Sequence, residues 1–87
     1  MNHPDFRVGG HIFATLGSPD AGHGMVQLLP EQQDLAIAAE PGSFRPAAGA
    51  WGRKGATLVR LEAVPADWLE RSLRWAWENR VAKNQRQ

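Results

Sequence analysis

Basic side chains gather in two stretches of this sequence. Residues 71–87 contain five basic residues against one acidic residue, Glu78. Residues 43–61 contain no acidic residue, and their basic residues are Arg45, Arg53, Lys54 and Arg60. Each cation that neutralises a phosphate releases condensed counterions, so such clusters are typical of nucleic-acid contacts. The two stretches therefore predict contacts with the phosphates of DNA.

An aromatic side chain lies close to the adjacent pair of cations. Trp51 precedes Arg53 and Lys54 along the chain, so its indole could stack on a base or sugar while the cations hold the backbone. A second basic turn would come from the residues on either side of two glycines near the start of the chain. The predicted nucleic-acid-binding residues are Arg7, His11, Arg45, Trp51, Arg53, Lys54 and Arg60.

Two other interpretations stay open. Lysine and arginine at the edge of a sheet also keep it soluble and block pairing with other strands. Trp68 and Trp77 are predicted to fill the core, because large side chains on the apolar face of a helix usually do so. The sequence does not decide whether Trp51 and Trp75 belong to the core. An apolar face that stays uncovered would make the chain a protein-interaction or homodimerisation module.

The sequence lacks the patterns of common catalytic and metal sites. His3, His11 and His23 lie eight and twelve residues apart, which fits no zinc-binding pattern. Residues 49–55 hold several glycines, but Lys54 lacks the flanking residues of a phosphate-binding P-loop. No serine lies in a nucleophile elbow. The chain is therefore predicted not to be an enzyme, with no catalytic residue, metal, cofactor or small-molecule substrate.

Length and composition indicate one small domain over residues 1–87. The hydrophobic fraction of 43% and the charged fraction of 22% are typical of a folded chain. A net charge of +1 excludes a highly basic coat protein. The sequence has no cysteine, no apolar stretch long enough to cross a membrane and no signal peptide at its start. These features predict a cytoplasmic protein with no membrane partner.

Glycines and prolines divide the chain into short segments, and residues 17–24 and 47–55 are predicted as turns or loops. The predicted strands are residues 5–8, 11–16, 24–29, 44–46 and 56–63, and the predicted helices are residues 30–39 and a last helix that Pro65 opens. This order predicts an α+β fold in which two helices pack on a mostly antiparallel sheet of about five strands.

The pair of glycines near the start predicts a tight hairpin. Two adjacent glycines tolerate the positive φ angles of a two-residue turn. Such a turn would pair Val8 with His11 and Phe6 with Phe13, and it would place all four side chains on one face.

Several segments resemble the MmcQ/YjbR-like family. They are HPDFRVGG at residues 3–10, IFATL at 12–16, WGRKGATLVRL at 51–61 and WAW at 75–77. The resemblance implies a CyaY-like α+β fold and DNA binding through a double-wing pair of hairpins. Family members usually carry a helix ahead of the first segment, and this sequence has none there. The resemblance leaves two explanations, a shortened chain or a sheet covered differently, for instance by a second copy.

Overall fold

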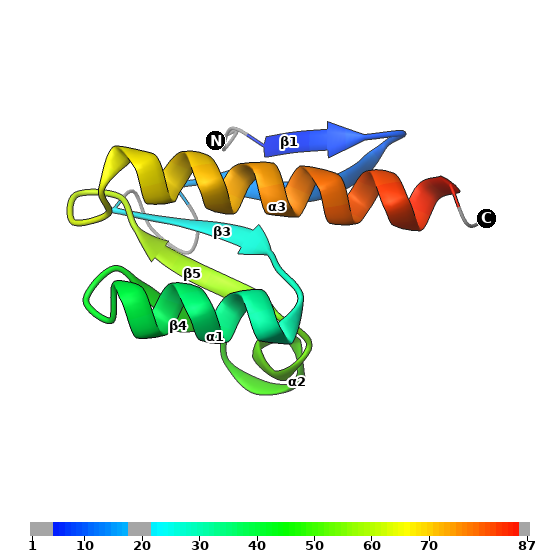
Figure 1. Cartoon of the computed structure of the whole chain (residues 1–87). Helices are drawn as coiled ribbons and strands as arrows, with labels where there is room; N and C mark the ends of the chain where they lie inside the picture. The colour runs from blue at the N-terminus through cyan, green and yellow to red at the C-terminus, as the bar shows by residue number, and fades with distance from the viewer. Residues whose placement is uncertain (1–4, 18–21, 86–87) are drawn as a thin grey trace.

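Five antiparallel strands form one sheet in the computed structural model of the chain, which describes residues 5–17 and 22–85 (Figure 1). The strand order across the sheet is β1-β2-β3-β5-β4. The strands are β1 (Asp5–Val8), β2 (His11–Leu16), β3 (His23–Gln27), β4 (Phe44–Pro46) and β5 (Ala56–Arg60). The predicted five-stranded antiparallel sheet is confirmed, and β4 lies at an edge, where its proline costs no ladder hydrogen bond.

The predicted register of the first hairpin is correct at its turn and wrong farther along. Gly9 and Gly10 have φ angles of +58° and +82°, and Val8 pairs with His11 as predicted. The register then shifts at a bulge, so Phe6 pairs with Ala14 and not with Phe13. The bulge lets Phe13 and Ala14, which are consecutive, both lie buried. The rings of Phe6 and Phe13 still lie 6.2 Å apart.

Two strands end earlier than the sequence pattern predicts. β3 ends at Gln27 because the next amide, that of Leu28, leaves the ladder and donates to the Gly55 carbonyl at 3.0 Å. β5 ends at Arg60, whose carbonyl accepts the Ala63 amide in a turn at 3.1 Å. β3 therefore stops where its next amide bonds to the turn that precedes β5, and β5 stops where a local turn begins.

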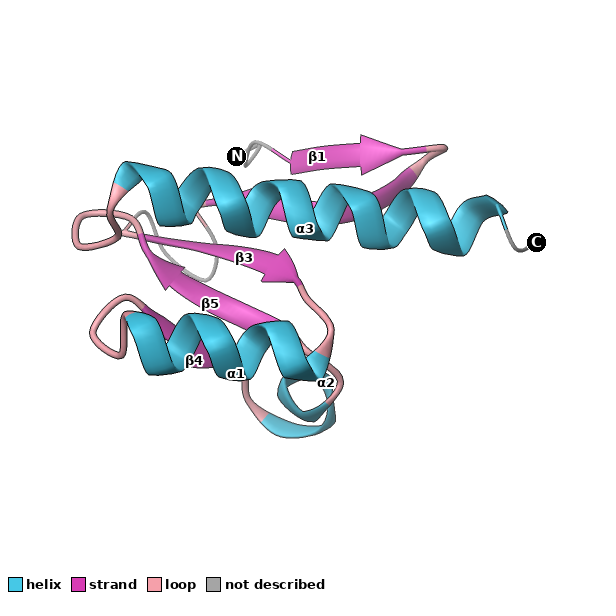
Figure 2. Ribbon diagram, in the orientation of Figure 1, coloured by secondary structure: helices cyan, strands magenta, loops and turns pink. Residues whose placement is uncertain are grey.

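Both long helices cover the same face of the sheet (Figure 2). α1 (Pro30–Ala39) has the predicted bounds and begins at a proline, which needs no amide partner there. α3 (Ala66–Gln85) begins directly after Pro65 and spans 20 residues. Within residues 5–17 and 22–85, no helix is both long and apolar enough to cross a membrane.

A third, short helix replaces part of the loop predicted over residues 47–55. α2 (Gly49–Arg53) joins β4 to β5. Glycine is needed inside it, because a Cβ on Gly52 would lie 1.8 Å from the Ala47 carbonyl oxygen. The prediction of two helices is therefore corrected to three in the described residues. Gly52 permits the close approach of α2 to the backbone of Ala47.

The connection of the β1–β2 hairpin and that of the β4–β5 hairpin lie at the same end of the sheet. β1, β3 and β4 run in the same direction, so the turn after β1 and α2 after β4 share that end, on the right of Figure 1. The C-terminal turns of α3 reach the same end, where the side-chain amide of Asn84 donates a hydrogen bond to the Val8 carbonyl at 3.0 Å. We call this the hairpin end.

The core lies between the sheet and the two long helices. Its buried residues are Phe13, Ala14, Val26, Leu28, Ala36, Phe44, Val59 and Ala76. Trp68 packs edge-on against Phe44 at 6.1 Å, as predicted for a core tryptophan. The prediction for Trp77 is wrong, because its side chain is 49% exposed. Ser72 and Ala76 are fully buried and form the centre of the packed face of α3. With the helix oriented in this way about its axis, Trp77 points outward.

Candidate nucleic-acid interface

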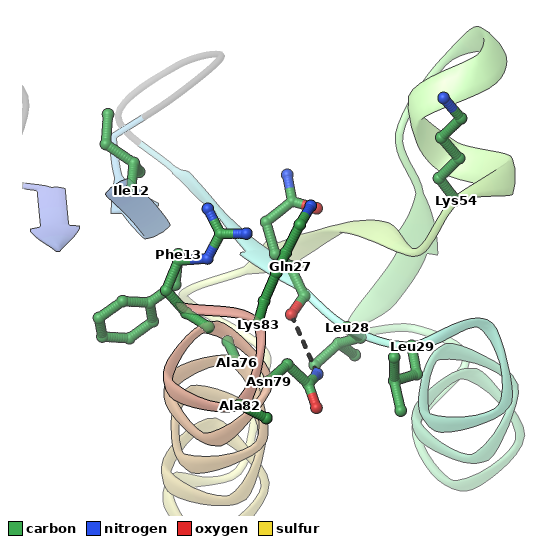
Figure 3. A pocket seen from close by; sticks show the side chains of 11 residues that line it. Ile12, Phe13, Gln27, Leu28, Leu29, Lys54, Ala76, Asn79, Ala82 and Lys83 are labelled. Carbon is green, nitrogen blue, oxygen red and sulfur yellow. Dashed lines mark hydrogen bonds between the residues drawn. The ribbon is translucent and has the colours of Figure 1, made fainter. Parts of the chain in front are cut away.

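A groove of about 550 Å³ crosses the hairpin end between the two hairpin connections (Figure 3). Its walls come from the start of β2, from the residue after α2 and from the last turns of α3, and its floor is the chain that leaves β3. We call it the end groove, and its lining residues are Ile12, Phe13, Gln27, Leu28, Leu29, Lys54, Ala76, Asn79, Arg80, Ala82 and Lys83.

The charge of the end groove is positive. Lys54, Arg80 and Lys83 line it, whereas no aspartate or glutamate within residues 5–17 and 22–85 does. In the described part of the chain these three side chains form no ion pair and no hydrogen bond. Lys54 and Lys83 are exposed and Arg80 is half-buried. Three cations from two distant segments are therefore available to an anionic ligand.

The position of α3 beside the end groove is fixed by a hydrogen-bonded amide. Asn79 Nδ2 donates to Gln32 Oε1 at 2.8 Å and lies 3.4 Å from the Gln27 carbonyl oxygen, the contact dashed in Figure 3. Gln32 Oε1 also accepts the Leu29 amide at 2.9 Å. These bonds tie the helix that carries Arg80 to the start of α1 and to the floor of the groove.

A buried glutamine fixes the opposite wall. Gln33 is 6% exposed, and its Nε2 lies within 3.2 Å of the Gly52 and Ala56 carbonyl oxygens and of Thr57 Oγ1. The Thr57 hydroxyl in turn donates to the Gly55 carbonyl at 2.8 Å. Since a buried amide without partners is costly, this network holds both ends of the segment that carries Lys54.

Several predicted residues do gather at the hairpin end. Arg53 and Lys54 are exposed at the end of α2, and Trp51 on the same helix is 69% exposed. His11 begins β2 on the far side of the end groove. Arg7 lies on β1 beside the turn, with its Nη1 atom 3.5 Å from the Gly10 carbonyl oxygen.

Arg45 and Arg60, which were predicted as phosphate contacts with Arg53 and Lys54, do not lie with them at the hairpin end. Arg45 pairs with Leu58, and both side chains lie on the sheet face opposite α1 and α3. Arg60 ends β5 at the far end of the sheet, where its guanidinium lies 3.2 Å from Glu62. The direction of β5 separates Arg60 from Lys54, although both belong to the same basic stretch of sequence.

Arg80 and Lys83 line the end groove but were not among the individually predicted contact residues. Their three-residue spacing, which places them on one side of a helix, was a signal for them. Asn79, Gln27 and Leu29 carry no comparable signal, because they join the groove only through tertiary packing. Arg86 of the same basic stretch lies outside the described residues.

The two histidines that the structure describes are not brought together. His11 lies at the hairpin end, whereas His23 pairs with Arg60 at the opposite end of the sheet. His3 lies outside the described residues. Within the described ranges, no three metal-ligating side chains are close enough to hold an ion.

A second groove, of about 450 Å³ and mostly apolar, lies between α3 and the outer hairpin β1–β2. We call it the side groove, and its lining residues are Phe6, Phe13, Glu70, Leu73, Arg74, Trp77 and Glu78. Phe6 is 38% exposed and Trp77 is 49% exposed, so an apolar strip reaches solvent beside the outer strand.

Comparison with known proteins identifies the family. A family model described as YjbR matches residues 1–79. The comparisons with curated proteins and with solved structures found no match. The matched region spans most of the sequence and includes all four resembling segments, which confirms the resemblance to the MmcQ/YjbR-like family. The chain belongs to the YjbR family.

Proposed function

We propose that the chain binds nucleic acid at its hairpin end and is not an enzyme. The observation that carries the proposal is the end groove, where Lys54, Arg80 and Lys83 converge and no acidic residue of the described chain lines the walls. Phosphates that enter the groove would neutralise these cations and release counterions. In a cell, the reducing cytoplasm fits a sequence without cysteine.

The two hairpin connections would act as wings on either side of the nucleic acid. Arg53 and Trp51 on α2 extend one wing, where the exposed indole can stack on a base. Arg7 and His11 extend the other. Arg45 would contact only nucleic acid that continued onto the open face of the sheet.

Salt dependence tests this proposal. We expect fluorescence anisotropy of a labelled DNA strand to show binding at low salt, because several phosphate contacts form at once. Three phosphate contacts to a single strand predict a slope of about −2 for log K against log salt. If neither duplex nor single-stranded DNA binds in a salt-dependent way, the proposal is wrong.

Self-association is a second candidate function, favoured by the side groove. β1 is an outer strand, so in the described structure its outer edge has no strand partner. Two copies related by a two-fold axis could pair their β1 edges antiparallel and cover Phe6 and Trp77 of each chain. Arg74 lies between Glu70 and Glu78 on the rim of the side groove. In a two-fold dimer, Arg74 of each copy could therefore face a glutamate of the other.

A charge placed in the side groove should prevent this dimer. We expect the wild-type mass, measured by sedimentation equilibrium, to rise towards that of two chains as concentration increases. Trp77→Glu should stay monomeric, because an unpaired carboxylate would be buried in the interface. Leu35→Glu, at a site on α1 that is 58% exposed, should behave like wild type. A monomeric wild type at every concentration would exclude self-association.

A further inference from the structure

The end groove exposes apolar side chains that phosphate binding does not explain. Ile12 is 40% exposed and Leu29 is 45% exposed, and both line the groove beside the cations. Beneath them lie Leu28 and Phe13, which belong to the core. A ligand that fits this lining has an anionic part and an apolar part close together.

A nucleotide unit has that combination, and the end groove can hold one. Its volume of about 550 Å³ falls within the range of small-molecule sites. Figure 3 shows the Gln27 side chain projecting between Ile12 and Lys54. No protein group described in the structure hydrogen-bonds to the Gln27 side-chain amide. This amide can therefore donate to and accept from the edge of a base.

A base in a duplex cannot enter such a recess, because it is paired and stacked inside the helix. We infer that the end groove takes an unpaired base of single-stranded nucleic acid, between Ile12 and Leu29, while the adjacent phosphates contact Lys54 and Lys83. This inference rests on the proposed function and narrows it. It makes the single strand the preferred ligand and the duplex a weaker one, held by phosphate contacts alone.

Filling the end groove without changing its charge tests the inference. Ala82 is an exposed residue of α3 that lines the groove, so Ala82→Phe would occupy space needed by the base. Ala38→Phe on α1 adds the same side chain at an exposed site outside the groove. We expect Ala82→Phe to weaken binding of a labelled DNA strand of about twelve nucleotides by roughly tenfold or more. Ala82→Phe should bind duplex DNA with the affinity of wild type. Ala38→Phe should bind both the single strand and the duplex with the affinities of wild type.

A strand with abasic sites gives a test that needs no variant. We expect it to bind wild-type protein about as weakly as the duplex, since it keeps the phosphates and lacks the bases. An RNA strand of the same sequence shows whether the sugar matters, and equal or tighter binding than DNA supports the groove as a general single-strand site. An RNA strand that binds no better than the duplex would overturn that generality.

The outcomes separate this inference from the proposed function. If duplex, intact strand and abasic strand bind equally and Ala82→Phe changes none of them, the base site is wrong while phosphate binding stands. If no nucleic acid binds in a salt-dependent way, both proposals fail. Melting curves of both phenylalanine variants establish that any loss of affinity occurs in folded protein.

Discussion

Replacing Arg80 and Lys83 together by glutamine is expected to lower the affinity for single-stranded nucleic acid by roughly 50-fold at about 50 mM salt. The two cations line the end groove, and in the described residues neither is neutralised by an acid. Losing two phosphate contacts should also flatten the slope of log K against log salt by about 1.4. Anisotropy titrations at several salt concentrations measure both quantities.

The same helix offers a matched control. Arg71 and Arg74 have the same three-residue spacing as Arg80 and Lys83 but lie outside the end groove. Arg71 stacks over the Trp68 ring at 4.7 Å, and Arg74 pairs with Glu70. Replacing both by glutamine removes the same charge and should leave the affinity within about twofold of wild type. Equal losses in the two double variants would mean that net charge, and not the groove, governs binding.

Gly55→Ala is expected to unfold most of the protein at room temperature. A Cβ at this position would lie 1.8 Å from the Leu28 carbonyl oxygen, and φ is +107°. The chain can relieve the clash only by giving up the hydrogen bond from the Leu28 amide to the Gly55 carbonyl. We expect a loss of more than about 4 kcal/mol in the free energy of unfolding, close to the whole stability of a domain this small.

Gly49→Ala separates steric contact from backbone strain. Gly49 also has a positive φ, +71°, but a Cβ there would meet nothing within 4 Å. Its substitution should cost only about 1 kcal/mol. Urea unfolding followed by tryptophan fluorescence measures both variants. If Gly55→Ala were as stable as Gly49→Ala, the close packing of this segment against the end of β3 would be refuted.

Local signals predicted the elements whose ends are set by one or two residues. The two glycines of the first turn adopt positive φ angles, and Pro30 begins α1. The bulge at Phe6 and the outward turn of Trp77 were not predictable, because each depends on how α3 packs against the sheet. α2 was missed because a five-residue segment with two glycines has little helix propensity of its own.

The candidate site was predictable only in part, for a similar reason. The sequence places Arg53 and Lys54 in a hairpin connection, and the structure has them there. It does not reveal that the last turns of α3 reach the same end and add Arg80 to the groove. Nor does sequence clustering show that strand direction carries Arg60 to the other end of the sheet.

The most direct test of the end groove as the binding site is an NMR titration of the labelled protein with a short DNA strand. We expect amide shifts to change at residues 27–29, at Lys54 and at residues 79–83. The amides of Arg45 and Leu58 on the open sheet face should change little. Shifts confined to that open face, or no shifts at low salt, would contradict the account.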